Sequence, residues 1–360
     1  MKIVTVLGAR PQFVKASVVS RALAKYDEIK EIIIHTGQHF DQNMSDIFFS
    51  ELDLLSPDYH LGIHGLSHGA MSGRMMEQIE ILLKEIKPDV VNVYGDTDST
   101  LAAALAACKL HIPVAHIEAG LRSFNRMMPE EINRVVTDHV SEILFTPTDT
   151  ADDNLHSEGI SSDKIFQVGD VMYDASLYYG AKAHAKSTLL KELKLEAKGY
   201  YLATIHRPQN TDTKEALSLI CNVLDEVAEK ISVVLPVHPR TRAKMREFNI
   251  ALRHVICIDP VGYLDMIALE SQSALIITDS GGVQKEAYFH RVPCVTLRSE
   301  TEWVELVRHR WNVVVPPSND VDMVSIIHHQ AETIGENVKL YGSGKASEKI
   351  AEHLVSRIRR

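Results

Sequence analysis

Short apolar runs alternate with longer amphipathic segments from one end of this chain to the other. The runs have the length of β-strands, and the segments between them repeat their apolar residues with a helical period. This alternation is typical of βαβ units, which build parallel sheets covered by helices. The predicted strands lie at residues 3–7, 31–35, 90–94, 114–118, 143–146 and 165–168 in the first half, and at 201–205, 232–237, 255–258, 274–278, 294–297 and 312–315 in the second.

Two sets of six strands predict an α/β fold with two doubly wound Rossmann-like domains. The length of 360 residues, about twice that of a typical domain, agrees with this division. We expect the first domain over residues 1–170 and the second over residues 171–345. The helical pattern of residues 346–360 has no strand after it, and we expect it to pack back on the first domain.

The charge and the cysteines narrow the classes of function. A net charge of −10 argues against binding to nucleic acid or to a membrane surface, so an anionic ligand needs local cations. Four cysteines lie far apart without a CxxC pair, and the histidines form no HExxH pattern, so no disulfide framework and no metal site is implied. The chain has no signal-peptide pattern and no apolar run as long as a membrane span, so we expect a cytoplasmic protein.

Ligands of open α/β sheets bind beyond the carboxyl ends of the strands, so the residues after each predicted strand are the candidates for function. After the first strand, Arg10 and Lys15 stand about one helical turn apart. They are candidate contacts for a phosphate or another part of a substrate, with a solvated helix face as the alternative. The turn that carries Arg10 is not GxGxxG, so it does not predict a dinucleotide site.

Three carboxylates in the first half are candidates for general acid/base catalysis: Asp96, Glu118 and Glu131. Asp96 is equally explained as a helix cap, and Glu131 as a charge in the first turn of a helix, worth ~0.3–1 kcal/mol. Glu118 has no such simple structural explanation, because it stands where an internal strand is expected to end. His116, two residues earlier, is equally well explained as a structural histidine.

In the second half, the strand that ends at Thr278 is followed by Asp279-Ser280-Gly281-Gly282 and a helical pattern. Glycines and the open N–H groups of a helix start favour an anion, above all a phosphate. Further along this helix, Glu286 is a candidate acceptor for the two hydroxyls of a ribose. An ordinary capped turn is the alternative.

Two histidines also follow strands of the second half. His206, beside Arg207, is a candidate diphosphate contact and proton donor, because imidazole titrates near neutral pH. His238 precedes Pro239 and Arg240, and spacing alone assigns it no chemistry.

With these residues in view, the chain resembles the non-hydrolysing UDP-N-acetylglucosamine 2-epimerase family over essentially its whole length. The resemblance depends on many short motifs in the same order, and none of them is decisive alone. The motifs are Gly-Ala-Arg-Pro at 8–11, Gly-Asp-Thr at 95–97, His-Ile-Glu-Ala-Gly-Leu-Arg at 116–122, Pro-Glu-Glu-Ile-Asn-Arg at 129–134, His-Arg at 206–207, His-Pro-Arg at 238–240 and Asp-Ser-Gly-Gly-Val-Gln at 279–284.

The resemblance implies a glycosyltransferase B type fold, a UDP-sugar in an interdomain cleft, no added cofactor and a homodimer. It also implies anti elimination of UDP to a glycal and its re-addition with C2 inverted. By motif, the catalytic residues are Asp96, Glu118, Glu131 and His206. The substrate-binding residues implied in the same way are Arg10, Lys15, Arg122, His238, Ser280, Gly281, Gly282 and Glu286.

Two departures from the family pattern bear on the substrate. Members that act on UDP-N-acetylglucosamine usually read Thr-Glu-Arg-Pro-Glu where this chain has Thr-Glu-Trp-Val-Glu at 301–305. They also usually read Gln-His-Arg, in a region used for an allosteric site, where this chain has Gln-His-Phe-Asp at 38–41. Both changes resemble the branch that epimerises UDP-2,3-diacetamido-2,3-dideoxy-glucuronate to the mannuronate form, which would serve surface polysaccharide synthesis.

Four other functions stay open at this point. The first is a UDP-N-acetylglucosamine 2-epimerase that makes UDP-N-acetylmannosamine. The second is a retaining glycosyltransferase, whose chemistry needs fewer carboxylates. The others are a non-catalytic UDP-sugar sensor and a hydrolysing epimerase, and the sequence favours neither.

Overall fold

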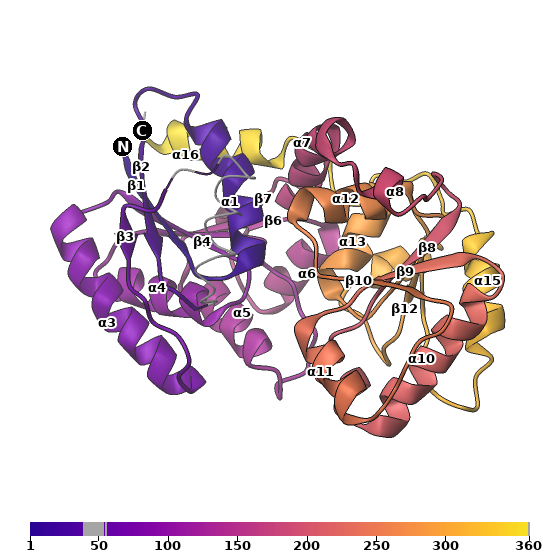
Figure 1. The fold of residues 1–360 in the computed structure, drawn as a ribbon. Coiled ribbons are helices and arrows are strands. Elements are labelled where there is room, and N and C mark those ends of the chain that lie inside the picture. Colours follow the sequence, from indigo (N-terminus) through magenta and orange to yellow (C-terminus); the bar gives the residue numbers. More distant parts are fainter. Residues whose placement is uncertain (39–53, 55, 359–360) are drawn as a thin grey trace. The chain divides into compact units, whose positions relative to one another are not determined.

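The computed structural model describes residues 1–38, 54 and 56–358. The chain forms two compact units, and each is built on one parallel sheet with helices packed against it (Figure 1). Unit 1 comprises Met1–Ala175 and Lys339–Arg360, and unit 2 comprises Ser176–Val338. Two Rossmann-like sheets are therefore present, as the alternating pattern predicts.

The sheet of unit 1 has the strand order β3-β2-β1-β4-β5-β6-β7, and every pairing is parallel. Its strands are β1 (Lys2–Leu7), β2 (Lys30–His35), β3 (Tyr59–His60), β4 (Val90–Tyr94), β5 (Val114–Ile117), β6 (Ile143–Thr146) and β7 (Ile165–Gln167). Among the described residues this sheet has seven strands, one more than the six predicted, because β3 is an edge strand of two residues. So short a strand shows no apolar run or alternation in the sequence.

The helices of unit 1 bury the sheet. They are α1 (Arg10–Leu23), α3 (His68–Ile86), α4 (Asp98–Lys109), α5 (Pro129–Val140), α6 (Asp149–Ser157), the 3-10 helix η1 (Ser162–Lys164), the start of α7 (Val171–Lys186) and α16 (Ala346–Ile358). Helices α3 and α4 share one apolar core with alternate residues of β1 and β4, such as Val4, Val6 and Val91.

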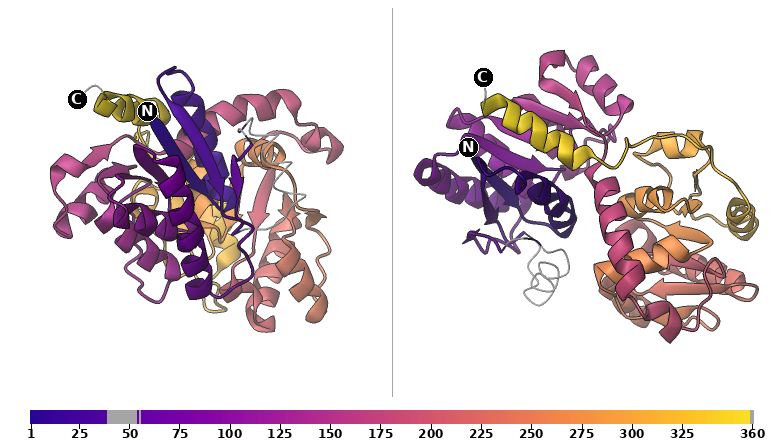
Figure 2. Two further views of the ribbon diagram at one scale, coloured as in Figure 1. Left: turned by 90° about the vertical axis from the view of Figure 1, so that its left-hand side faces the viewer. Right: turned by 90° about the horizontal axis from the view of Figure 1, so that it is seen from above.

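The terminal helix α16 belongs to unit 1 and lies beside α1 (Figure 2). The ring centroid of His353 on α16 lies 3.9 Å from that of Phe166 in β7, with the rings tilted, and 5.5 Å from that of Phe145 in β6, edge to face. Aromatic contacts between a helix and two strands fix the helix on the sheet.

The sheet of unit 2 has the order β10-β9-β8-β11-β12-β13, again with parallel pairing throughout. Its strands are β8 (Tyr200–Thr204), β9 (Ser232–Pro236), β10 (Ile256–Ile258), β11 (Leu275–Thr278), β12 (Cys294–Thr296) and β13 (Asn312–Val314). Its helices are the rest of α7 with α8 (Leu189–Glu192), α9 (Pro208–Thr211), α10 (Lys214–Ala228), α11 (Pro239–Glu247), α12 (Tyr263–Gln272), α13 (Gly281–Phe289), α14 (Val304–Arg308) and α15 (Met323–Ala331).

Both faces of this second sheet are buried. Tyr201 and Ala203 of β8 lie in one apolar core, whereas Tyr200 and Leu202 lie in another. Successive residues of a strand point to opposite faces, so an apolar run without polar alternation is what a doubly covered parallel strand requires.

Strand order reverses at one position in each sheet, between β1 and β4 in unit 1 and between β8 and β11 in unit 2. These switch points open a crevice at the carboxyl ends of the strands, where ligands of doubly wound sheets bind. The segments after β1, β4, β8 and β11 are therefore the first places to look for a site.

Gly169 packs against Tyr341, in the segment that returns from unit 2 to unit 1, and this contact can be tested. Its φ is 98°, and an added Cβ would lie 2.9 Å from the carbonyl oxygen of Tyr341. We expect Gly169→Ala to lower the free energy of unfolding by ~1–3 kcal/mol, measured by urea denaturation. Gly73→Ala in α3 is the control, because its Cβ meets nothing within 4 Å and should add ~0.5–1 kcal/mol. Equal stability of the two variants would contradict the assigned strain.

Candidate functional site

Lys15 and Glu118 form an ion pair at the switch point of unit 1. Lys15 extends from α1, and Glu118 follows β5 directly. Each side chain is 10% exposed. Glu118 has a φ of 71°, unusual for a residue with a side chain, and its backbone N–H donates to the carbonyl of Phe145 at 3.1 Å. The chain thus turns sharply after β5 and presents this carboxylate beside a cation.

Asp96 and Glu131 share one guanidinium, that of Arg134 on α5. Arg134 donates to Asp96 Oδ2 from Nε at 3.0 Å and from Nη2 at 2.7 Å, and to Glu131 Oε2 from Nη1 at 2.7 Å. Gly95, next to Asp96, is so close to the other pair that an added Cβ would lie 3.5 Å from Glu118 Oε1. The structure therefore brings the three predicted acid/base carboxylates together, each paired with a cation.

Glu131 is almost fully buried and holds a loop. Its oxygens accept hydrogen bonds from the backbone N–H groups of Ser123 and Phe124, both at 2.9 Å, and from the Ser123 hydroxyl at 3.0 Å. Burial acts to raise its pKa, but these donors and Arg134 hold the pKa below its ordinary value. Glu131 is thus an ionised anchor for this loop, and its part in acid/base chemistry stays a prediction.

Two more residues of the first half were predicted to contact the substrate. Arg10 is the first residue of α1, at the carboxyl end of β1, and is half-buried. Arg122 lies inside the protein, with a side chain only 1% exposed, and donates to Asp138 at 2.7 Å and to both oxygens of Glu158 at 2.7 Å. Its guanidinium is engaged by these two carboxylates, which favours a structural role over ligand contact.

Asp279 is the centre of the corresponding region in unit 2. This fully buried carboxylate follows β11 and accepts hydrogen bonds from the backbone N–H groups of His206 and Arg207, at 3.0 and 2.9 Å, and from Asn210 Nδ2 at 3.1 Å. It also lies 3.2 Å from Nδ1 of His206. Asp279 therefore fixes the segment after β8 and orients the imidazole of His206, whose side chain is 40% exposed.

The two histidines of unit 2 lie near each other, with ring centroids 5.6 Å apart. His238 precedes α11, and its Nδ1 accepts a hydrogen bond from the backbone N–H of Arg240 at 3.2 Å. An acceptor Nδ1 leaves the proton of the neutral ring on Nε2. The structure thus brings predicted residues from the ends of β8 and β9 together.

Ser280 is the N-cap residue of α13, and its hydroxyl makes no capping bond. A Cβ at Gly281 would meet the carboxylate of Glu302, which would have to shift. A Cβ at Gly282 would instead meet nothing within 4 Å. Exposed backbone N–H groups at such a helix start can bind a phosphate.

The segment after β12 is fastened to this turn. Trp303 Nε1 donates to the carbonyl of Gly281 at 2.9 Å, and its ring lies 4.2 Å below the ammonium group of Lys285. Arg298 Nη1 donates to Glu302 at 2.9 Å. Trp303 is thus a buried contact of the glycine turn. The second departure from the family pattern, at residues 39–41, lies outside the described residues.

Glu286, the predicted ribose ligand, is half-buried on α13. A second carboxyl, that of Glu270 on α12, is completely buried, and its Oε2 lies 3.9 Å from Nε2 of His290. Burial, aided by the negative charge of Glu286, raises the pKa of Glu270 well above its ordinary value. Burial also lowers the pKa of His290 to about 4, so its imidazole is uncharged at neutral pH.

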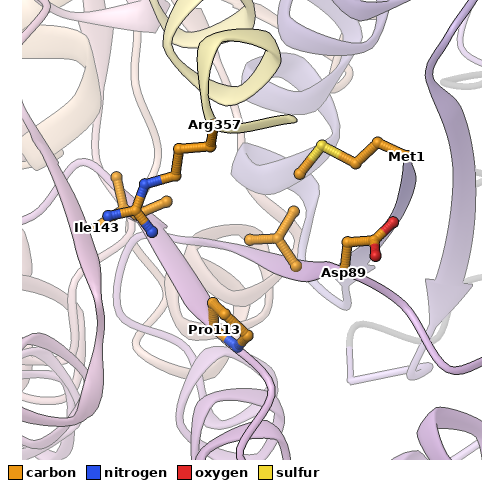
Figure 3. A pocket seen from close by; sticks show the side chains of 6 residues that line it. Met1, Asp89, Pro113, Ile143 and Arg357 are labelled. Atoms are coloured by element: carbon orange, nitrogen blue, oxygen red, sulfur yellow. The ribbon is translucent and has the colours of Figure 1, made fainter. Parts of the chain in front are cut away.

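A cavity of about 440 Å³ lies elsewhere in unit 1, at the amino ends of β4 and β6 (Figure 3). Met1, Asp89, Val90, Pro113, Ile143 and Arg357 line it. It is at the opposite end of the strands from the ion pairs described above, where doubly wound folds do not place their ligands. We assign the site to the carboxyl ends instead.

Sequence reasoning missed the residues that hold the candidates in place. Gln12 accepts hydrogen bonds from the N–H groups of Gly8 and Ala9 at 2.8 and 2.9 Å, and donates to the carbonyl of Tyr94. Arg134 and Asp279 act similarly, as shown above. The one signal in the sequence was helical spacing, because Glu131, Arg134 and Asp138 stand three and four residues apart on one helix.

Among the described residues, no three histidine, cysteine or carboxylate side chains gather as they would around a metal ion. Within the same part of the chain, each helix is too short or too polar to cross a membrane.

Comparison with known proteins gives a consistent result. The model of the UDP-N-acetylglucosamine 2-epimerase family matches residues 21–355. The UDP-2,3-diacetamido-2,3-dideoxy-D-glucuronate 2-epimerase of Pseudomonas aeruginosa is 53% identical over 98% of this chain and 99% of its own. A UDP-N-acetylglucosamine 2-epimerase homolog of Methanococcus maripaludis is 52% identical over 98% of this chain and 99% of its own.

Solved structures resemble the whole chain as well. The crystal structure of the Methanocaldococcus jannaschii UDP-GlcNAc 2-epimerase in complex with UDP-GlcNAc and UDP has a TM-score of 0.90 and 42% identity, over 99% of this chain and 100% of that one. The Neisseria meningitidis enzyme bound to UDP-GlcNAc has a TM-score of 0.89 and 32% identity, over the same shares.

Glu270 gives a test by pH. Its pKa is raised in the folded protein, so unfolding releases a proton once the pH exceeds the ordinary pKa of a glutamate, and stability falls as pH rises from there. Glu270→Gln removes this release, so Tm of the variant minus Tm of the parent protein should grow with pH. Scanning calorimetry measures it, with Glu226→Gln, an exposed carboxylate on α10, as the control. Parallel Tm curves for parent and Glu270→Gln would contradict a protonated Glu270.

Proposed function

Because the chain belongs to the UDP-N-acetylglucosamine 2-epimerase family, whose members are isomerases, we propose that it epimerises UDP-2,3-diacetamido-2,3-dideoxy-glucuronate at C2 to the mannuronate form. One observation carries the class of reaction: carboxylates paired with cations at one switch point, and a turn suited to a diphosphate at the other. The identity of 53% to the Pseudomonas aeruginosa enzyme supports this substrate.

The reaction needs a base at C2 and donors at the leaving group. A base removes the C2 proton, the C1–O bond breaks with its electron pair going to UDP, and a C1=C2 glycal forms. UDP then adds back to C1 as C2 takes a proton on its other face. Both steps depend on proton transfer and on stabilising a leaving anion.

We assign the proton transfers to Asp96, Glu118 and Glu131. Lys15 pairs with Glu118 and Arg134 pairs with Asp96, so each of these carboxylates is held in place by a cation. Glu131 also holds Arg134 and the loop at Ser123, which supports the geometry of the other two carboxylates.

We assign the diphosphate to Ser280, Gly281 and Gly282 at the start of α13, with Arg10 as a further cation. Two observations support this assignment: the Ser280 hydroxyl makes no capping hydrogen bond, and there is open space beside Gly282. We assign His206 to the departure and return of UDP, since Asp279 orients its ring.

Three other assignments are weaker in geometry. Glu286 is proposed to bind the ribose hydroxyls because it lies on α13, the helix that begins at the glycine turn. His238 is proposed to contact the nucleotide because it lies beside His206. Arg122 was predicted among the substrate contacts. Its ion pairs with Asp138 and Glu158 favour a structural role. For the assembly we propose a cytoplasmic homodimer that serves surface polysaccharide synthesis, as the resemblance implies.

The second candidate substrate is UDP-N-acetylglucosamine, which would give UDP-N-acetylmannosamine. The structural relatives from Methanocaldococcus jannaschii and Neisseria meningitidis, both described with UDP-GlcNAc bound, favour it. A retaining glycosyltransferase is more distant, because its chemistry does not need three carboxylates around the sugar.

NMR in D2O separates the two substrates. We expect UDP-2,3-diacetamido-2,3-dideoxy-glucuronate to invert at C2 and to gain deuterium there, and UDP-N-acetylglucosamine to do neither at a comparable rate. Deuterium enters because the C2 proton exchanges through the catalytic carboxylates. Exchange with UDP-N-acetylglucosamine alone would leave the mechanism standing and overturn the substrate assignment. Exchange with neither would overturn the proposed reaction.

Glu118→Gln tests the assignment of the base. The variant keeps the shape of the side chain and loses its ability to accept a proton, so turnover and C2 exchange should be abolished. UDP affinity, measured by calorimetry, should stay within about tenfold, or ~1.4 kcal/mol. Glu77→Gln, an exposed carboxylate on α3, is the matched control and should be fully active. A fully active Glu118→Gln variant would refute the role.

A further inference from the structure

His116 occupies the interior of unit 1, two residues before Glu118, and is fully buried. Its Nε2 lies 2.7 Å from the carbonyl oxygen of Gly95, and its Nδ1 lies 2.6 Å from Oδ1 of Asp138. A carbonyl oxygen only accepts hydrogen bonds, so Nε2 must carry a proton. From the sequence alone, no catalytic or binding role was predicted for His116.

Asp138, near the end of α5, is also fully buried. Its second oxygen, Oδ2, accepts a hydrogen bond from the backbone N–H of Gly120 at 3.1 Å and pairs with Arg122 Nη1 at 2.7 Å. Burial acts to raise the pKa of Asp138, but His116 and Arg122 hold it below its ordinary value, so the carboxylate is ionised. Nδ1 of His116 then donates to it as well.

Both ring nitrogens of His116 thus face hydrogen-bond acceptors. Arg122 continues the network to Glu158, whose two oxygens each accept from it at 2.7 Å. Basic side chains and carboxylates therefore alternate through the network. Such a balance is what allows charged side chains to remain in a protein interior.

The backbone groups that this network holds flank the proposed catalytic carboxylates. Gly95, which receives the His116 bond, directly precedes Asp96, and its Cα faces the Lys15–Glu118 pair. Gly120, which donates to Asp138, stands two residues after Glu118. One buried pair thus fixes the chain next to Asp96 and on both sides of Glu118.

We propose that His116 and Asp138 are positioning residues of the 2-epimerase reaction, which set the separation of Asp96 and Glu118 through the Gly95 carbonyl and the Gly120 amide. The inference rests on the proposed function. Removal and return of a proton at C2 require both carboxylates within hydrogen-bond reach of the same carbon. A shift of about 1 Å in such a group is enough to lower the rate about a hundredfold.

Two substitutions of His116 separate its two contacts. A glutamine places its amide nitrogen where Nε2 was and keeps a donor for Gly95, whereas an asparagine places its nitrogen where Nδ1 was and keeps the contact to Asp138. His116→Asn should lose about a hundredfold in kcat, and His116→Gln should lose clearly less. KM and the Kd for UDP should change less than about threefold in both, because nucleotide contacts lie elsewhere. The rate of C2 deuterium exchange should fall in parallel with kcat.

Substitutions on the carboxylate side test the same network. Asp138→Asn should lower kcat as His116→Asn does. Glu158→Gln changes the outer end of the network, where the side chain is 25% exposed, and is the variant most certain to fold. It loosens the hold of Arg122 on Asp138 and should lower kcat about threefold to tenfold at unchanged KM.

Asp225→Asn is the matched control. Asp225 also fastens a chain segment, since it accepts from the backbone N–H groups of Arg253 and His254, but it lies in unit 2 away from the proposed site. It should lower Tm and leave kcat unchanged. Asp138 and His116 variants that lower Tm alone, as this control does, would overturn the proposal. A parent enzyme without C2 exchange would instead refute the proposed function itself.

Discussion

Burial of both faces of the two parallel sheets is the constraint on which the rest of this structure depends. The strands of unit 2 send successive side chains into separate apolar cores, so no strand interior has room for a ligand. Chemistry is thereby confined to the strand ends and the turns that follow. The proposed functional residues gather at the two switch points because these are the places where neighbouring connections diverge.

Helix α5 is the element that aligns the proposed sugar side of the site. Glu131, Arg134 and Asp138 follow one another at helical spacing and reach, respectively, the loop at Ser123, the carboxylate of Asp96 and the ring of His116. One rigid helix therefore contacts β5, the loop that follows β5 and the segment after β4. Placing several supports on a single helix keeps their mutual distances fixed, which loops do not achieve.

The sequence predicted the parts of the fold that repeat and the residues that stand at strand ends. The apolar runs gave all twelve main strands, because a doubly buried strand leaves a continuous pattern, whereas β3 left none. His206, Ser280 and Glu118 were predicted as candidates from their positions after strands, and the structure places each of them after one. The pairing of Arg134 with Asp96, 38 residues away, and of Asp279 with His206, 73 residues away, depends on tertiary packing and has no local pattern. Arg122 shows the converse, because a motif placed it among ligand contacts and only the packing revealed its two carboxylate partners.

The hydrogen bond from Trp303 to Gly281 joins a position that departs from the family pattern to the turn proposed to hold the diphosphate. The indole that stands where the family pattern usually has arginine is also the hydrogen-bond donor to the carbonyl of Gly281. An evolutionary change of the residue at this position therefore alters the support of the turn proposed to hold the diphosphate. Selectivity and nucleotide affinity would have to evolve together here, through compensating changes around Gln284 and Lys285, which contact the same segment.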